Sequence, residues 1–208
     1  LKRAALLYDS ESEYSLNLTR SFGRKFVELG GTVVLEQPYR FSDSSYGPLV
    51  KMAIQAKPDL LFVAGHDESA IILRTAEDMG LDAVFMGGDG WDTPGFFTKG
   101  GNTLSQGYFT THWDRELNGP LHTKFLEYCN MPESSSALAF DAVLLAVEAL
   151  RRADPKDHAS VRDALASIQD FRGVTGLMDM TAWGDAIKPV VLKRIVNGEQ
   201  RLVRRYMP

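Results

Sequence analysis

Short apolar runs alternate with helical periodicity over the first 113 residues, and this alternation limits the possible folds more than any other feature of the chain. The apolar runs lie at Ala4–Tyr8, Val33–Leu35, Leu60–Val63, Val84–Met86 and Tyr108–Phe109. Runs with so little polar alternation are typical of strands buried on both faces, as in a parallel sheet covered by helices. The pattern therefore predicts an α/β fold: a parallel flavodoxin-like sheet of five strands with helices on both faces.

Apolar stripes at helical spacing lie between these runs. They are Leu18, Phe22, Phe26 and Leu29; Leu49, Val50, Ala53 and Ile54; and Ile72, Leu73, Ala76 and Met79. The stripes are followed by Gly30-Gly31, Lys57-Pro58 and Gly80, which are residues that end helices. Thr93-Pro94 has the form of an N-cap followed by proline and predicts a short fourth helix.

The second part of the chain has a different pattern. Residues 117–170 are predicted to be mostly helical, at Leu121–Tyr128, Ala137–Arg152 and Ala159–Ile168. No strand separates these helices, so any sheet that they cover must come from elsewhere. Strands are predicted at Gly173–Met180 and Pro189–Val196, and Asn197-Gly198 is typical of a hairpin turn.

Composition excludes several classes of function. A net charge of -4 gives no general basic field for nucleic acid, and no apolar run approaches the roughly 18 residues of a membrane span. The single cysteine, Cys129, excludes an internal disulfide and a cysteine-based zinc cluster. His66 and His112 have no ligand partner at metal spacing, so we expect neither a metal nor a cofactor. No signal peptide is visible, which indicates either a cytosolic protein or a natural N-terminus upstream of Leu1.

Acidic and aromatic residues follow four of the predicted strands, at the edge where open parallel sheets bind ligands. The segments are Asp9–Tyr14, Gly65–Glu68, Gly87–Asp92 and Thr111–Asp114. Carboxylates pair with an ammonium group and aromatic rings cover apolar surface, so the edge suits a cationic ligand with an apolar body. Three carboxylates in the first turn would repel the phosphate of a flavin or dinucleotide.

Structural explanations of the same residues stay open. Asp9, Glu11 and Glu13 also suit helix caps and first-turn acids. Tyr14 and Trp91 also suit the core, and Asp89 between two glycines also suits a turn.

Several segments together resemble the second half of the type I periplasmic solute-binding proteins, in the receptor group of the branched-chain amino acid ABC transporters. They are Tyr8–Tyr14, Ser42-Asp43 leading to Lys57-Pro58-Asp59, Phe85–Trp91, Ala139–Val143, Phe171–Gly176, Gly184-Asp185 and Lys188–Val191. The segments occur in the family's order and near its spacing, across nearly the whole chain.

The resemblance implies a two-lobed receptor that binds an amino acid or similar metabolite without chemistry and delivers it to a membrane permease. Residues 1–115 with 188–208 would form the second lobe, and 116–187 an incomplete, helical part of the first. The implied ligand contacts are Tyr14, Gly65, His66, Asp89, Trp91 and Phe140. The implied location is periplasmic or extracellular, with a lipid-anchored form included.

Two further consequences follow from this resemblance. The incomplete first lobe would expose the apolar stripe that contains Val143 and Leu150, which favours self-association or a complementing fragment. Phe140 stands where the family often has tyrosine, so it can only pack. Two alternatives stay open: a ligand-sensing domain of the same fold, and an enzyme on a flavodoxin-like sheet that uses Asp9 or Asp89 as a base.

Overall fold

The computed structural model describes residues 1–117, 119 and 121–208, which divide into two compact units. Unit 1 comprises Leu1–Thr110 with Lys193–Arg201, and unit 2 comprises Thr111–Leu192 with Leu202–Pro208. The chain therefore passes between the units three times. The last segment, Leu202–Pro208, groups with unit 2.

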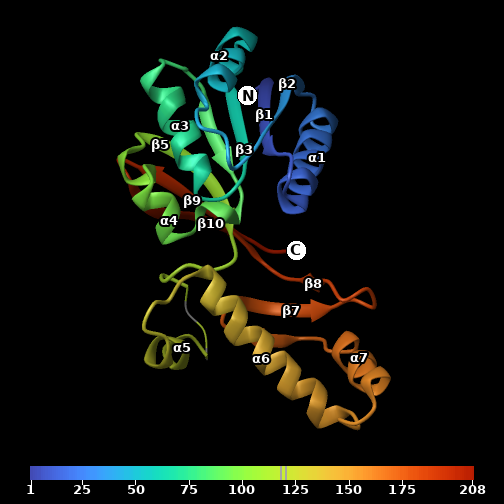
Figure 1. The fold of residues 1–208 in the computed structure, drawn as a ribbon. Helices are drawn as coiled ribbons and strands as arrows, with labels where there is room; N and C mark the ends of the chain where they lie inside the picture. The colour runs from blue at the N-terminus through green and yellow to red at the C-terminus, as the bar shows by residue number, and fades with distance from the viewer. Residues whose placement is uncertain (118, 120) are drawn as a thin grey trace. The chain divides into compact units, whose positions relative to one another are not determined.

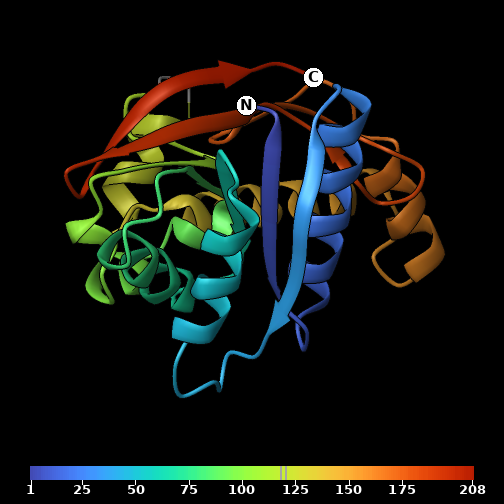
Figure 2. The same cartoon turned by 90° about the horizontal axis from the view of Figure 1, so that it is seen from above.

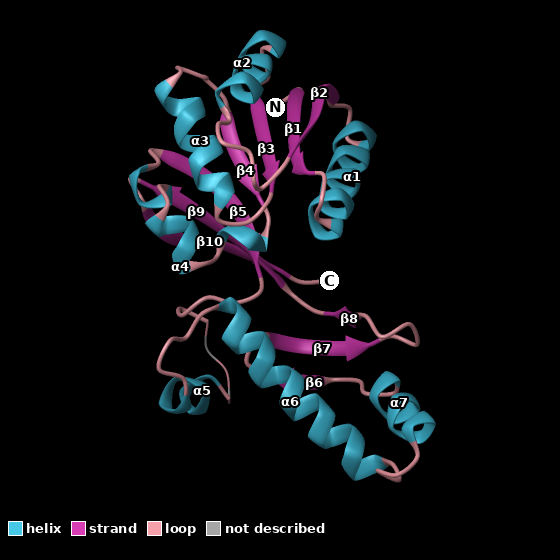
Figure 3. Cartoon of the chain, viewed as in Figure 1, coloured by secondary structure: helices cyan, strands magenta, loops and turns pink. Residues whose placement is uncertain are grey.

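The strands of unit 1 confirm the predicted parallel sheet (Figures 1 and 3). Its order is β10-β9-β5-β4-β3-β1-β2, and the pairs β1–β2, β1–β3, β3–β4 and β4–β5 are parallel. The first five strands are therefore in the flavodoxin order 2-1-3-4-5. The strand bounds are β1 Arg3–Asp9, β2 Thr32–Tyr39, β3 Leu60–Ala64, β4 Val84–Gly87, β5 Gln106–Thr111, β9 Val190–Val196 and β10 Glu199–Tyr206.

Helices cover both faces of this sheet because its strands are apolar on both sides. In β1, Ala4 and Leu6 belong to one core cluster, whereas Ala5 and Leu7 belong to another. The first cluster packs against α1, and the second packs against α2, α3 and α4, which Figure 2 also separates by the sheet. The helices are α1 Glu13–Glu28, α2 Gly47–Ala56, α3 Glu68–Asp78 and α4 Pro94–Thr98, with short 3-10 turns η1 Asp89–Trp91 and η2 Gly101–Thr103.

The hairpin predicted at Asn197-Gly198 is present and joins β9 to β10. Both residues have positive φ angles, 50° and 78°, as this kind of tight turn requires. The Asn197 and Gly198 amides donate to the carbonyls of Ser105 and Leu104, so the turn is tied to the start of β5.

Unit 2 contains the three predicted helices, as α5 His122–Tyr128, α6 Ser134–Arg152 and α7 His158–Ala166. The single strand predicted at Gly173–Met180 is wrong in one respect. It is a hairpin of β6 Phe171–Gly173 and β7 Gly176–Met180, and β8 Ala186–Ile187 pairs with β7 to complete a three-stranded sheet. The turn forms because Asp141 of α6 accepts from the amides of Val174 and Thr175, at 2.6 and 2.8 Å.

The outer face of α6 is apolar and exposed. Val143 is 62% exposed and Leu150 46% exposed, so the stripe expected to be uncovered is uncovered in this structure. None of the described helices is long and apolar enough to cross a bilayer.

Candidate functional site

Tyr14, His66 and Asp89 meet at the carboxyl ends of β1, β3 and β4, although 75 residues separate Tyr14 from Asp89. Each residue follows its strand directly or in the first turn of the next helix. In a parallel sheet these ends lie on one edge, so the topology itself brings the three side chains together. We call this group, with Gly65 and Gly90, the rim.

The hydroxyl of Tyr14 links two segments of the rim. It donates to Asp89 Oδ1 at 2.8 Å and accepts from the Gly90 amide at 3.1 Å. Burial, and then the charge of Asp89, raises the pKa of Tyr14 far above its usual range. Tyr14 therefore keeps its proton at neutral pH and holds the Asp89 carboxylate in a fixed position.

His66 provides the exposed aromatic surface of the rim. Its ring stacks on that of Tyr14, with 5.0 Å between centroids and 26° between planes. Gly90 lies close to it, since a Cβ on Gly90 would come within 3.0 Å of His66 Nδ1 and 2.3 Å of the Gly65 carbonyl oxygen. Together the rings and the carboxylate form a surface that suits a ligand with both a cationic and an apolar part.

A buried pair, Tyr39 and Glu68, supports the rim from below. Glu68 Oε1 accepts from the Tyr39 hydroxyl at 2.8 Å and from the His66 amide at 3.0 Å. A Cβ on Gly65 would lie 2.1 Å from the Tyr39 hydroxyl and 2.3 Å from Glu68 Oε1. Gly65 is therefore required for this packing, and Glu68 fixes the backbone that carries His66.

Sequence reasoning did not identify Tyr39 or Glu68 as part of the site. Glu68 has the sequence signature of an acid in the first turn of a helix, and Tyr39 ends a strand like any core tyrosine. Only the distance between their side chains reveals the pair. The position of Glu68 gave some indication of a role in the site, because it belongs to the Gly65–Glu68 segment that follows β3.

Two of the predicted contact residues lie away from the rim surface. Trp91 is fully buried in the core of unit 1, where its ring stacks on Phe96 and its Nε1 donates to the Val63 carbonyl. It offers no surface to a ligand in this structure. Phe140 is on α6 in unit 2, half-buried, and packs edge-on against Phe125 with 5.6 Å between ring centroids.

The acids of the first turn have structural roles. Asp9 is 8% exposed, and its Oδ1 accepts from the Glu11 amide at 3.0 Å. Ser12, rather than an acid, caps α1 by accepting from the Ser15 amide. Among the described residues no group of three or more His, Cys, Asp or Glu side chains is placed to hold a metal ion.

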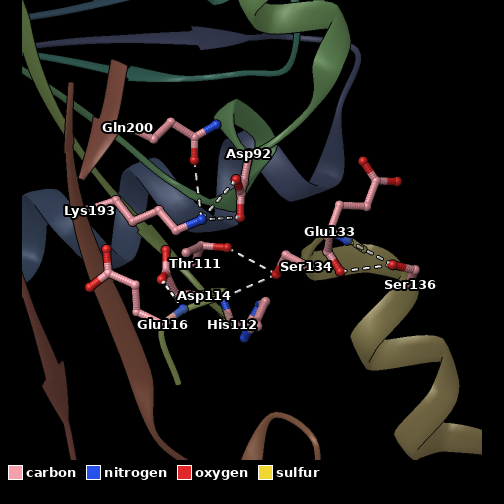
Figure 4. Close-up of polar contacts among 10 residues, drawn as sticks. All are labelled: Asp92, Thr111, His112, Asp114, Glu116, Glu133, Ser134, Ser136, Lys193 and Gln200. Atoms are coloured by element: carbon pink, nitrogen blue, oxygen red, sulfur yellow. Dashed lines mark hydrogen bonds and ion pairs between the residues drawn. The ribbon is translucent and has the colours of Figure 1, made fainter. Parts of the chain in front are cut away.

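Figure 4 shows polar contacts within unit 1 and, separately, polar contacts within unit 2. In unit 1, Lys193 Nζ lies 3.4 Å from each carboxylate oxygen of Asp92 and 3.1 Å from Gln200 Oε1. Both charged side chains of this ion pair are 7% exposed. In unit 2, Ser134 Oγ accepts from the Thr111 hydroxyl at 2.9 Å and from the His112 amide at 3.2 Å.

Comparison with protein families gives a match over residues 1–200 to the family model described as "Periplasmic binding protein". The chain belongs to this family. Among curated proteins, "Leu/Ile/Val-binding protein homolog 2" of Brucella abortus is 27% identical over 203 residues, which are 95% of this chain and 54% of that protein. "Leu/Ile/Val-binding protein homolog 1" of Brucella suis is 25% identical over 192 residues, or 90% and 51%.

Among solved structures, the leucine-binding protein LivK of Thermotoga maritima has a TM-score of 0.92 at 30% identity, covering all of this chain and 61% of that one. A solute-binding protein of R. palustris in complex with benzoate has a TM-score of 0.84 at 17% identity, covering 100% and 59%. The second likeness concerns the fold alone. This member of the periplasmic binding protein family spans about half the length of the curated relatives that it matches.

Proposed function

We propose that the chain is part of the substrate-binding component of an ABC transporter and that its rim grips the ammonium end of an amino acid or similar metabolite. The observation that supports this is the Tyr14–Asp89 hydrogen bond of 2.8 Å, which presents a fixed carboxylate beside the exposed ring of His66. The family is one of substrate-binding proteins, and the name of the Thermotoga relative indicates leucine as its ligand.

We propose that Asp89 pairs with the ammonium group while His66 and Tyr14 cover the apolar part of the ligand. Gly65 contributes through its backbone, and Phe140 through packing from the other lobe. Trp91 supports the rim from the core. The mechanism is closure: a ligand that contacts both lobes binds the closed state more tightly and so shifts the population towards it. No bond of the ligand changes.

The proposed lobes are residues 1–115 with 188–208, and 116–187 as an incomplete first lobe. Support comes from the exposed face of α6, where Val143, Val147 and Leu150 are 62%, 39% and 46% exposed. An apolar hollow of about 360 Å³, lined in part by Phe125 and Phe140, continues this face. We propose that a sheet outside this chain covers the face in the longer protein, and that the chain alone associates with itself or with a complementing fragment.

We propose a periplasmic or extracellular location, including a lipid-anchored form, and a membrane permease as the protein partner. The family description supports the location. The permease partner follows from the function as a transporter component and is tested separately, by binding of the ligand-loaded protein to the permease.

Calorimetry on the full-length protein with leucine, isoleucine and benzoate tests the proposal. Asp89→Asn removes the charge that faces the ammonium group, so affinity for an amino acid should fall by about 2–5 kcal/mol, the usual loss when one partner of a desolvated charge pair is removed. Asp82→Asn, at an exposed position just before β4, is the control and should bind like the parent.

Unchanged affinity in Asp89→Asn would remove that residue from the site. Binding of benzoate alone, with no amino acid bound, would overturn the ammonium interaction. Recovery of a chemically altered ligand after long incubation would favour the enzyme instead.

A further inference from the structure

Unit 2 contains a basic pocket that the proposed amino acid site does not use. The pocket has a volume of about 180 Å³ and lies at the β6–β7 turn and the end of β10. Its lining includes Arg172, Gly173, Val174, Gly176 and Arg205. Lys188 is not a lining residue, but its charge acts on that of Arg205. We propose that this pocket binds a small oxyanion or carboxylate, held by Arg205 with Lys188 nearby.

Arg205 is set close against the turn backbone. A Cβ on Gly176 would lie 2.0 Å from Arg205 Nη2, so a larger residue at that position would displace the guanidinium group from its present place. Gly176 also has a φ of 123°, in the region that favours glycine. The turn is therefore shaped to admit this arginine.

Arg205 and Lys188 both bury a nitrogen without an acceptor. Among the described residues, no hydrogen-bond partner lies in reach of Arg205 Nε or Lys188 Nζ. Burial lowers the pKa of Lys188 to about 8, with Asp141 opposing the shift and Arg205 adding to it. A buried cationic group without an acceptor is unfavourable, and an anion that accepts from both side chains would remove that cost.

The carboxylate that acts on Lys188 is already engaged. Asp141 is 2% exposed and accepts from the Val174 amide, the Thr175 amide and the Thr175 hydroxyl, at 2.6, 2.8 and 2.7 Å. Among the residues that line the pocket, Arg172 and Arg205 are charged and none is acidic. The lining therefore carries a net positive charge.

The size and shape of the pocket indicate the class of anion. At about 30 Å³ per water molecule, the volume of about 180 Å³ holds roughly six waters. This is enough for sulfate, phosphate or a short carboxylate. The planar fork of an arginine matches two oxygens of such a group, which favours an oxyanion over chloride.

The test is calorimetric titration of the chain with sulfate, phosphate and acetate at pH 6.5, in chloride buffer of constant ionic strength. We expect saturable binding of at least one of them, with affinity at least 10-fold lower in Arg205→Gln and in Lys188→Gln. Binding of sulfate or phosphate identifies a tetrahedral oxyanion as the ligand, and binding of acetate alone identifies a carboxylate. Arg162→Gln is the control, because this arginine of α7 is exposed and pairs with Asp163.

The pH dependence provides a second measurement that needs no variant. Sulfate keeps its charge between pH 6.5 and 9.5, whereas Lys188 loses its proton over this range. Sulfate affinity should therefore fall above about pH 8. Absence of saturable binding at pH 6.5, or equal binding by the parent and the Arg205 and Lys188 variants, would overturn the proposal. Neither result would bear on the rim, which is in unit 1.

Discussion

The pair of Tyr39 and Glu68 gives the sharpest test of how the rim is held. Tyr39 is 4% exposed and Glu68 is 3% exposed, and Glu68 Oε1 accepts from the Tyr39 hydroxyl and from the His66 amide. We consider Tyr39→Phe, Glu68→Ala and the double variant. The first removes one donor, whereas the second leaves two donors without their acceptor.

The expected magnitudes follow from these contacts. Tyr39→Phe should cost about 1.5–3 kcal/mol of unfolding free energy, the range for a hydrogen bond to a charged group. Glu68→Ala should cost more, since each buried donor left unsatisfied costs about 1–3 kcal/mol. Once Glu68 is absent, removing the Tyr39 hydroxyl should cost little. The loss of unfolding free energy in the double variant should therefore be about 1.5–3 kcal/mol smaller than the sum of the losses in the two single variants.

Urea unfolding followed by circular dichroism measures these free energies, and hydrogen exchange of the His66 amide measures the local effect. Exchange should speed up in Glu68→Ala, because that amide loses its acceptor. Tyr128→Phe, at a position 79% exposed, is the control and should change neither measurement. If the two losses add within about 0.5 kcal/mol, the pair does not act as a unit and the reasoning is refuted.

Three other predictions concern stability. The pKa of both Tyr14 and Tyr39 is raised above 10.0, and burial is the largest cause. The free energy of unfolding should therefore be retained below pH 10. Above pH 10 it should fall by up to about 1.4 kcal/mol per pH unit for each tyrosine. Urea unfolding at pH 9 to 11 measures the slope, and an equal slope in Tyr39→Phe would contradict this. Asp141→Asn places an amide against backbone donors and should cost about 3–5 kcal/mol in urea unfolding, whereas Asp185→Asn, at an exposed turn, should cost almost nothing. Gly198→Ala should lower the free energy of unfolding by at least about 1 kcal/mol more than Gly80→Ala. Both variants have the strain of a positive φ, but only Gly198→Ala adds a steric clash. The φ angles are nearly equal, at 78° for Gly198 and 77° for Gly80. A Cβ on Gly198 would lie 1.9 Å from the Asn102 carbonyl oxygen, whereas a Cβ on Gly80 would have no atom within 4 Å. Equal melting temperatures of the two variants would contradict the predicted clash.

The strands and helices of unit 1 follow from local patterns. In β1, alternate residues face opposite core clusters, so a continuous apolar run is the direct consequence of two covered faces. The hairpin at Asn197-Gly198 is equally local, because positive φ angles favour these two residue types. The β6–β7 hairpin was not predictable in this way. Its turn depends on Asp141, which lies 33 residues before Val174.

Some features of the site likewise follow from the sequence, and others do not. That Tyr14, His66 and Asp89 share an edge could be predicted, since the edge follows from strand order. Whether Trp91 faces a ligand or the core stayed open in the sequence, because the short turn η1 sets the direction of its side chain and only the structure shows it to be buried.

The sequence by itself determined the α/β class, the family and the edge on which polar residues gather, because these depend on periodicity and on short segments of the chain. Tertiary structure alone decided that Glu68 supports His66, that Gly65 makes room for Tyr39 and Glu68, and that Arg205 and Lys188 lie close enough to interact. Such pairings depend on side-chain distances of a few ångströms between residues far apart in the chain. Packing of the whole unit sets those distances.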